Sequence, residues 1–534
     1  MSKRSVVTLA LIVALGFSVR IAYLLHVTSQ PRYQWVDPDH YDLKGRVLAQ
    51  DGQGWRWTFD AVRHSSYDQR FYVLPPGYPV FLSLFALFPG YPFSAQVGQV
   101  FMATAAVALL FFLGRQLHSE RAGLIAAAIY AAWLPNIIAV WSTMQESIYI
   151  PIVLLAFVLL LRALIKQDTA TRWDFAAAGV AFGIATLTRS MPMYMLPFLA
   201  ALVVYRDRFR SVGNLAALFG GFCLLTIPYS IALSQHLGQA TFVENHGSIF
   251  IVERYGGVEG DEPPSMTQTA IILIGGFVDA PAATMRDWWG TIHSVFHVNG
   301  GRLLQIYLGA QTKAGALFAK FATHLFGDLA FVMCLLLAPL GVVLSRRPFL
   351  ATFLLVWIVV NIGLVTLSGF GGPRLRAPIE PQLIALTAIV LAGSYRGVDK
   401  KLLAIAGLVA VVMANIVLPQ LPRSFRARAD YGVHWPLKAP PKRSAMTGTA
   451  GFNVLVTDKA EVVRFNVRPR NPSGRTDVEV RLNGEAAERV RLTDGEHRFE
   501  LDWPSPGLVH VELVASDPRT GEPVRLYVIV PKTT

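Results

Sequence analysis

The fold is decided by a long apolar run near the start of the chain, SVVTLALIVALGFSVRIAYLLHV at residues 5–27. A crossing of the bilayer needs about 20 such residues in a helix, and this run supplies them. Similar runs recur along the chain, which is 53% hydrophobic and only 16% charged. The sequence therefore predicts a polytopic α-helical membrane protein rather than a soluble one.

We predict about eleven membrane-spanning helices along the chain. Their approximate ranges are 5–27, 95–115, 121–140, 146–165, 173–188, 192–205, 213–235, 325–345, 349–368, 376–394 and 401–419. Only a short break around Arg189 separates the fifth range from the sixth. These two ranges form either a helical hairpin, which we favour, or one bent helix.

The distribution of basic residues predicts the orientation, because Lys and Arg in short loops mark the cytoplasmic side. The net charge of +13 gathers in alternate short loops, so it indicates membrane orientation and no nucleic-acid partner. No small-residue cleavage site follows the first span, which we therefore expect to be an uncleaved anchor. With an odd number of spans, the carboxyl-terminal region lies outside. We expect a multi-pass protein of the cytoplasmic (inner) membrane, with its long loops and carboxyl-terminal region extracytoplasmic, or periplasmic.

Composition divides the chain into three parts. We predict a transmembrane domain at residues 1–419, with long outer loops at 28–94 and 236–324, a linker at 420–445 and a β-sandwich at 446–534. About six short alternating runs after the Pro-rich linker are typical of strands. The sandwich contains no catalytic spacing, so we expect an accessory binding or docking module.

Two details refine these predictions. Asn483-Gly484 follows one of the alternating runs and is a strong hairpin signal. In the second long loop, the apolar stretch from Ala270 to Val278 is too short to cross a bilayer. We expect that stretch to be re-entrant or interfacial.

An acidic and aromatic cluster, Asp37-Pro38-Asp39-His40-Tyr41, follows the first span. Pro38 favours an extended backbone, on which Asp37 and Asp39 point the same way. Such a pair can share a cation, or one carboxylate can act as a general base while the other orients it. The alternative is a pair of solvated aspartates in a turn. Two Asp and one His are too few ligands to name an ion, so no cofactor is assigned and a divalent metal at Asp37 and Asp39 stays open.

Four charged residues on the outer side are further candidates. Arg189, Arg374 and Arg376 lie there against the positive-inside trend. The planar fork of arginine matches phosphate oxygens, so these three can bind a phosphate; the alternative is interfacial anchoring by snorkelling. Glu146 begins an apolar span, where an acid is either a functional group or compensates the helix N-terminus.

Three more residues belong to the candidate set. Tyr41 and Tyr78, the latter in the turn Leu74-Pro75-Pro76-Gly77-Tyr78-Pro79, can pack on a sugar, shape the loop or anchor at the interface. Arg20 lies near the outer end of the first span, where we expect its side chain to snorkel.

These motifs, in this order, resemble the polytopic GT-C glycosyltransferases, and most of all the bacterial subgroup that includes aminoarabinose and protein mannosyl transferases. The resemblance covers roughly residues 5–395. It rests on Arg20, the Asp four residues before Tyr41, Leu48-Ala49 with Gly52-x-Gly54, the Pro-Pro-Gly-Tyr-Pro turn, Glu146, Leu187-Thr188-Arg189 and Pro373-Arg374-Leu375-Arg376-x-Pro378.

The resemblance implies a transferase that passes a sugar from a polyprenyl-phosphate donor to a lipid, glycan or protein acceptor at the outer membrane face. It implies that Asp37 is the catalytic base, because Asp37 stands at the matching distance before Tyr41. Asp39 departs from the family pattern, so the division of labour between the two carboxylates stays open. Arg189, Arg374 and Arg376 would hold the donor phosphate, and Tyr41, Tyr78 and Glu146 would contact substrate.

Three alternatives to this function remain at the level of sequence. A lipid or sugar transporter is expected to carry acidic or broken helices in mid-membrane, whereas the polar residues here gather in the outer loops. A non-catalytic scaffold for the β-sandwich needs no outer carboxylates and arginines together. A transferase like the O-antigen ligases would share the substrates and the membrane side.

Overall fold

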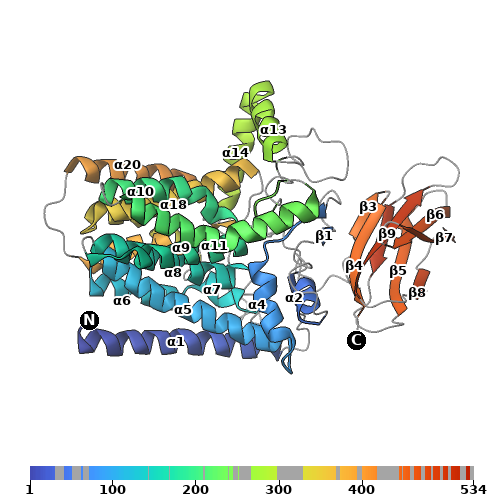
Figure 1. Cartoon of the computed structure of the whole chain (residues 1–534), viewed down its shortest axis with the longest axis horizontal. Helices are drawn as coiled ribbons and strands as arrows, with labels where there is room; N and C mark the ends of the chain where they lie inside the picture. The colour runs from blue at the N-terminus through green and yellow to red at the C-terminus, as the bar shows by residue number, and fades with distance from the viewer. Residues whose placement is uncertain are drawn as a thin grey trace.

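The computed structural model shows a bundle of long helices and a β-rich carboxyl-terminal part (Figure 1). The residues that it describes are 1–29, 41–50, 62–63, 71–141, 144–166, 169–207, 211–238, 240–244, 251, 266–296, 327, 329–368, 373–393, 400–417 and the strands from 444 to 529. The long helices of the bundle are α1 (Lys3–Thr28), α5 (Phe93–Leu117), α6 (Glu120–Ala131), α8 (Glu146–Lys166), α9 (Arg172–Thr188), α10 (Leu196–Asp207), α11 (Ser211–Leu237), α17 (Ala330–Leu344), α18 (Pro348–Ser368), α19 (Glu380–Ala392) and α20 (Lys400–Val417).

Every one of the eleven predicted ranges overlaps a helix of this bundle. Among the described residues, five helices are long and apolar enough to cross a membrane alone, namely α1, α5, α8, α11 and α18. A bent pair of helices adds a sixth span if the pair is counted as one. The helical, multi-pass character is therefore confirmed, and the count of eleven stays a prediction.

The third predicted span, 121–140, was wrong as one continuous helix. The structure breaks it into α6, which ends at Ala131, and the short α7 (Leu134–Ala139). Pro135 lies in the first turn of α7. Because proline has no backbone N–H, it could not donate the hydrogen bond that a continuous helix needs at this position. Trp133 and Asn136 thus lie at a helix break, where their side chains form hydrogen bonds with neighbouring segments.

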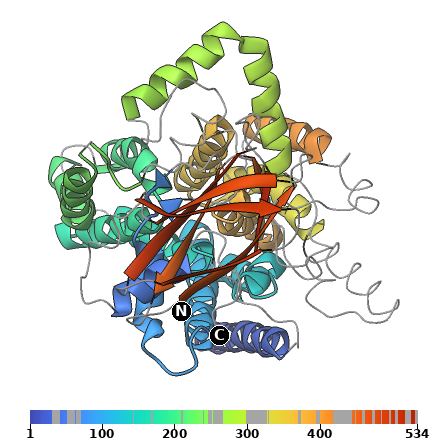
Figure 2. The same cartoon turned by 90° about the vertical axis from the view of Figure 1, so that its right-hand side faces the viewer.

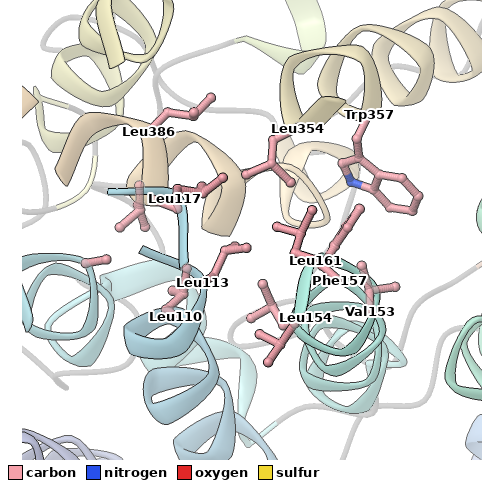
Figure 3. Packing of buried hydrophobic residues seen from close by; sticks show 14 of the residues in the cluster. Leu110, Leu113, Leu117, Val153, Leu154, Phe157, Leu161, Leu354, Trp357 and Leu386 are labelled. Atoms are coloured by element: carbon pink, nitrogen blue, oxygen red, sulfur yellow. The ribbon is translucent and has the colours of Figure 1, made fainter. Parts of the chain in front are cut away.

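The core of the bundle is a dense apolar layer between α5, α8, α18 and α19 (Figure 3). Phe157 of α8 meets Trp357 of α18 edge to face, with the ring centroids 5.0 Å apart. Leu110 of α5 and Leu386 of α19 are fully buried in the same layer. Side chains of this kind fix the helices rigidly, so polar groups at their ends are held in place.

Close glycine contacts decide between the two possibilities for the fifth and sixth ranges. A Cβ added at Gly179 of α9 would lie 2.0 Å from the carbonyl oxygen of Leu218, and one at Gly183 would lie 2.9 Å from that of Phe222. The contact positions rise by four residues in both helices, from Gly179 to Gly183 and from Leu218 to Phe222, so α9 and α11 run parallel. The chain between them must therefore return, so α9 and α10 form a hairpin, joined by the short 3-10 helix η2 (Met191–Met195).

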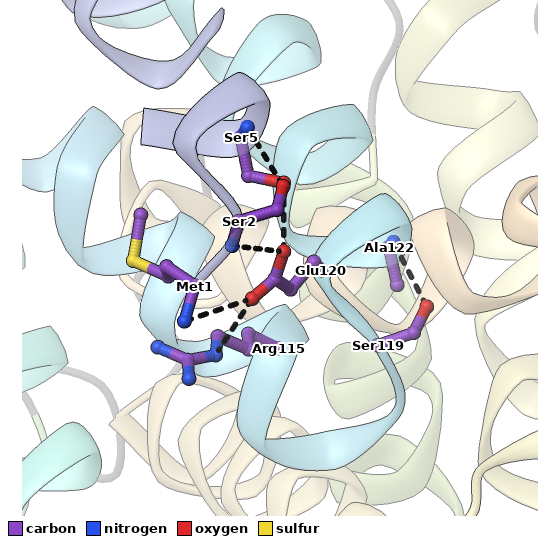
Figure 4. A network of polar contacts seen from close by, with 7 residues as sticks. All are labelled: Met1, Ser2, Ser5, Arg115, Ser119, Glu120 and Ala122. Carbon is purple, nitrogen blue, oxygen red and sulfur yellow. Dashed lines mark hydrogen bonds and ion pairs between the residues drawn. The ribbon is translucent and has the colours of Figure 1, made fainter. Parts of the chain in front are cut away.

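Glu120 fastens α1 to the turn between α5 and α6 at the far end of the bundle from the candidate site (Figure 4). Its carboxylate accepts hydrogen bonds from the Ser5 hydroxyl at 2.7 Å and the Ser2 backbone N–H at 3.3 Å. Arg115 Nε lies 3.8 Å from the same carboxylate. Hydrogen bonds from Ser5 and Ser2 hold the Glu120 pKa below its ordinary value.

The carboxyl-terminal part contains two antiparallel four-stranded sheets, with strand orders β3-β10-β5-β8 and β4-β9-β6-β7. The hairpin expected at Asn483-Gly484 is present, because Leu482 of β6 pairs with Glu485 of β7. The connecting pair itself lies outside the described residues, and the face-to-face sandwich stays a prediction. The strands are β3 (Ser444–Thr447), β4 (Thr449–Val456), β5 (Val462–Arg470), β6 (Arg475–Leu482), β7 (Glu485–Thr493), β8 (His497–Asp502), β9 (Gly507–Ser516) and β10 (Arg525–Ile529).

Gly179 supplies a test of the helix packing. We expect Gly179→Ala to lower the free energy of unfolding by about 1–3 kcal/mol, because the new methyl group would overlap a backbone carbonyl. Gly220→Ala in α11 is the matched control, since nothing lies within 4 Å of its added Cβ. Alanine there should be neutral or stabilising by about 0.5–1 kcal/mol. Thermal unfolding in detergent measures both, and equal melting temperatures would contradict the packing.

Candidate active site

The residues after the acidic cluster form a short helix, α2 (Tyr41–Gln50), which packs closely on α4 (Gly77–Ala86). Tyr41 and Tyr78 are both buried and meet edge to face, with their ring centroids 5.1 Å apart. A Cβ at Gly45 would lie 2.7 Å from the Leu82 side chain, so only glycine permits this approach of the two helices. The chain therefore leaves the acidic cluster at a fixed point, beside Tyr78.

The proline-rich turn before α4 rests on the end of α9. Val73 and Leu74 are fully buried, and Gly77 faces the backbone of Thr188. A Cβ at Gly77 would lie 2.9 Å from the Thr188 Cα and 3.0 Å from the Leu187 carbonyl oxygen. Two of the sequence motifs, the Pro-Pro-Gly turn and Leu187-Thr188-Arg189, are thus in direct contact.

A buried hydrogen-bond relay connects Tyr78 to the beginning of α8. The Tyr78 hydroxyl donates to Gln99 Oε1 at 2.5 Å, and the Ser147 hydroxyl donates to the same oxygen at 2.8 Å. Gln99 Nε2 in turn donates to the Val140 carbonyl at 2.9 Å. Tyr78 therefore supports the loop that ends at Glu146, which is the residue before Ser147.

Glu146 and Arg189 form a buried ion pair where α8 begins and α9 ends. Arg189 Nη1 lies 3.1 Å from Glu146 Oε1. Glu146 is 3% exposed and Arg189 is 9% exposed, so the snorkelling alternative for Arg189 is wrong. The guanidinium also lies over the Tyr149 ring, 6.0 Å from its centroid. We call the end of the bundle that carries this pair the site end.

Glu244 is a second carboxylate beside the same pair, and it belongs to none of the sequence motifs. The Ser190 hydroxyl donates to Glu244 Oε1 at 2.5 Å. Desolvation raises the pKa of Glu244, while the Ser190 hydrogen bond and the charge of Arg189 act against that rise. Arg189 is therefore set between two acids, one from α8 and one from the segment after α11.

A second buried ion pair lies at the start of α19. Arg376, in the 3-10 helix η5 (Pro373–Arg376), places Nε 2.9 Å from Glu380 Oε1. Trp133 Nε1 donates to Glu380 Oε2 at 2.6 Å, and the Arg376 guanidinium lies 3.9 Å from the centroid of the Phe331 ring. Arg376 is 5% exposed, so it too is an ion-paired residue rather than a snorkelling one. Sequence reasoning missed Glu380, although it follows the motif by only two residues.

Arg20 also departs from the sequence prediction, because its side chain is fully buried. Its guanidinium donates five hydrogen bonds to neutral oxygens: two to Asn136 Oδ1, and one each to the carbonyls of Gly16, Tyr130 and Ala131. The snorkelling prediction was wrong because the break between α6 and α7 presents free carbonyls and an amide to this side chain. Arg20 therefore clamps α1 to the α6–α7 junction.

Three predicted site residues are not tested by these contacts. Asp37 and Asp39 lie outside the described residues, and Arg374 is described only as part of the η5 backbone. Asp42, which the sequence analysis did not single out, is buried just beyond them. It accepts hydrogen bonds from the Tyr91 hydroxyl and from Arg46, whose Nε lies 3.2 Å from Asp42 Oδ2. Within the described ranges, no three His, Cys, Asp or Glu side chains gather as metal ligands.

The structure thus brings Tyr41, Tyr78, Glu146 and Arg189 into one contact network and places Arg376 in a second one at the same end of the bundle. Both arginines already hold a carboxylate. A phosphate that bound either one would compete with that carboxylate for the guanidinium. A carboxylate displaced in this way would lose its arginine partner while buried, so it would need a proton or another partner.

The Glu146–Arg189 pair can be tested by its effect on stability. Glu146→Gln leaves Arg189 buried without this partner, so we expect a loss of about 3 kcal/mol in the free energy of unfolding. Arg489→Gln, which breaks the pair between the exposed Arg489 of β7 and Glu479 of β6, should cost about 1 kcal/mol or less. A double-mutant cycle with Arg189→Gln measures the coupling, and additive losses would show that the pair contributes nothing.

Glu244 predicts a dependence of stability on pH. Its folded-state pKa lies above the ordinary value of 4.5 because of desolvation. Such a carboxyl stabilises the fold fully below its unfolded pKa, and that contribution is lost as pH rises through the folded pKa. We expect the melting temperature of Glu244→Gln to fall less than that of the wild type between pH 4.5 and neutral pH. Parallel curves over this window would contradict the shift.

Comparison with known proteins finds a family model that matches part of the chain. Residues 74–231 match the family model described as "Dolichyl-phosphate-mannose-protein mannosyltransferase". Among curated proteins, no sequence matches the chain. The matched segment begins at the proline-rich turn and contains the α8–α9 ion pair.

Three solved structures illustrate what the fold is similar to. The oligosaccharyltransferase AglB from Archaeoglobus fulgidus, in complex with an inhibitory peptide and a dolichol-phosphate, is 16% identical over 79% of this chain and 56% of its own, with a TM-score of 0.46. This chain thus spans little more than half the length of AglB. ArnT from Cupriavidus metallidurans, bound to undecaprenyl phosphate, is 16% identical over 76% of this chain and 77% of its own, with a TM-score of 0.35.

The arabinosyltransferase EmbB from Mycobacterium smegmatis is 12% identical over 98% of this chain and 64% of its own, with a TM-score of 0.29. The segment that matches the family model holds the turn at Leu74, the relay through Gln99 and the Glu146–Arg189 pair. Over this segment, the chain is similar to the family described as dolichyl-phosphate-mannose-protein mannosyltransferases.

Proposed function

We propose that this protein moves a sugar from a polyprenyl-phosphate donor to a lipid, glycan or protein acceptor at the outer face of the cytoplasmic membrane, with Asp37 as the general base. The observation that carries the proposal is the buried contact chain from Tyr41 through Tyr78, Gln99 and Ser147 to Glu146. It fixes the point from which the acidic cluster extends. The matching family model names dolichyl phosphate mannose, a polyprenyl-phosphate sugar, which agrees with this donor class.

The covalent reach of the chain supports Asp37 and Asp39 as members of this site. Asp37 precedes Tyr41 by four residues, and four residues of fully extended chain span at most about 14 Å. Asp39 is tethered within about 7 Å by the same measure. Because Tyr41 is buried against Tyr78, this short tether supports a position for both carboxylates near the site end. A divalent ion held by them remains compatible with this proposal.

The reaction balances with the groups available. The acceptor oxygen or nitrogen attacks the anomeric carbon of the sugar, and the bond from that carbon to the phosphate oxygen breaks. The acceptor proton passes to the Asp37 carboxylate, and the lipid phosphate leaves with the electron pair. Asp39 then orients Asp37 or shares a cation with it, and the sequence leaves these two roles open.

We propose that Arg189, Arg374 and Arg376 hold the donor phosphate, and that Tyr41, Tyr78 and Glu146 shape the substrate site. Burial prepares the two arginines whose side chains are described, because their guanidinium groups are already oriented by Glu146 and Glu380. Tyr41 and Tyr78 are buried against each other. Of the three roles foreseen for them, the shaping of the loop therefore agrees best with the geometry.

The finer architecture belongs to the same proposal. We propose eleven spans in a transmembrane domain at residues 1–419, with the site end facing outward, a linker at 420–445 and a β-sandwich at 446–534. The basic loops at the opposite end of the helices support this orientation. The two four-stranded sheets supply the faces that such a sandwich needs, and we assign to it an accessory role in docking.

Transfer from a radiolabelled polyprenyl-phosphate sugar, in membranes that carry each variant, tests the assignment. We expect Asp37→Asn to lower the rate by about 10²–10⁴-fold, since it removes a general base. Asp477→Asn, which breaks an ion pair between Asp477 of β6 and Arg491 of β7 in the carboxyl-terminal part, is the matched control. Equal rates in wild type and Asp37→Asn would show that Asp37 is not the base. Movement of the donor across the membrane without transfer would favour a transporter.

A further inference from the structure

Two helices of the second long loop project from the site end of the bundle. They are α13 (Met266–Asp279) and α14 (Pro281–Val295), and they meet at a bend of 113° measured between Thr267–Asp279 and Pro281–Ile292. The bend is fixed from both sides: the Thr284 hydroxyl donates to the Gly276 carbonyl at 2.9 Å, and the Phe277 and Trp288 rings stack 5.5 Å apart. The pair is therefore a defined V-shaped arm.

The outer surface of this arm exposes large apolar side chains. Between Met266 and Val278, α13 carries no charged residue. Its large apolar side chains are nevertheless exposed, with Ile271 and Ile274 at 63% and Val278 at 68%. Met285 and Trp289 extend the same exposure onto α14, at 60% and 51%. Contiguous apolar surface of this kind marks a contact with a partner or a membrane.

The direction of the arm identifies what covers it. The long helices of the bundle are seen end-on in Figure 2, whereas both limbs of the arm are seen along their length. The limbs therefore lie across the direction in which the spanning helices run, which is the plane of a bilayer around them. Together the two limbs are long and apolar enough to span a membrane, yet the bend between them prevents them from crossing it as one helix.

The arm is also joined to the part of the site that carries arginines. Its α14 limb packs against α18 and against η5, the segment of Arg374 and Arg376. Polar groups of α14, such as the exposed Arg286 and Asp287, supply the hydrophilic side of an amphipathic helix. Apolar residues on one side and charged residues on the other are the pattern of helices that lie in a membrane interface.

We propose that α13 and α14 form an interfacial arm, seated in the headgroup and upper acyl region of the bilayer at the site end, and that this seat sets the height of η5 relative to the membrane. Of the re-entrant and interfacial alternatives for Ala270 to Val278, the geometry points to the interfacial one. This inference rests on the membrane setting of the helices and not on the proposed reaction. Its occupant is the lipid surface, not a second protein.

Spin labels in vesicles test the depth of the arm directly. In a Cys223→Ala/Cys334→Ala background, single cysteines are placed at Ile274 and Val278, at Arg286 on the polar side, at Leu11 in mid-span of α1 and at Arg489 in β7. Accessibility to oxygen, which partitions into lipid, is compared with accessibility to a water-soluble nickel chelate. We expect labels at 274 and 278 to lie at equal depth, shallower than label 11, and to be shielded from nickel. The nickel accessibility of label 286 should be closer to that of label 489.

Each other outcome overturns the proposal. Nickel accessibility at 274 and 278 equal to that at 489 would place the arm in water. Oxygen accessibility that rises from 274 to 278 and reaches the value at 11 would make the segment re-entrant. Shielding from both reagents together with spin–spin broadening would show that a second copy of the chain covers the arm. The melting temperature of each labelled protein separates these results from unfolding.

Discussion

The candidate site depends on one interaction, the buried ion pair between Glu146 at the start of α8 and Arg189 at the end of α9. A charge that is removed from water is tolerated only when a partner and further hydrogen bonds compensate it. The start of α8 and the end of α9 must therefore lie at the same level of the bundle. Gly77 brings the proline-rich turn onto Thr188, the residue before Arg189. The position of α4, and through it of α2, follows from where this pair can form.

Among the residues that the structure describes, three buried arginines satisfy the same requirement in different ways, and the difference separates their roles. Arg20 gives all five of its hydrogen bonds to neutral oxygens at a helix break, so an incoming phosphate would have to dismantle the fold around it. Arg189 and Arg376 each form an ion pair with a buried carboxylate, Glu146 and Glu380 respectively. On the proposed function, a phosphate at Arg189 or Arg376 would displace a side-chain carboxylate and no backbone carbonyl, which is why we propose these two among the described arginines.

Composition and apolar runs predict the helices well, because about 20 consecutive apolar residues have few alternatives to a helix in a membrane. They do not predict side-chain pairing. Glu146 and Arg189 are both visible as motifs, yet nothing in their spacing says that they meet, and the partner Glu380 is invisible until η5 and α19 are folded. Pro135 did carry a signal for the break after α6. Because the helix break was not predicted, the side chain of Arg20 was wrongly predicted to snorkel. Most acceptors of its guanidinium lie at that break.

On the proposed function, the carboxylate partners have a further consequence for catalysis. The donor phosphodiester carries one negative charge, whereas the departing lipid phosphate develops a second as the bond to the sugar breaks. A carboxylate with one charge competes with the donor on nearly equal terms but loses to the leaving group. The arginines therefore bind more strongly as the reaction proceeds, and only such differential binding lowers the barrier.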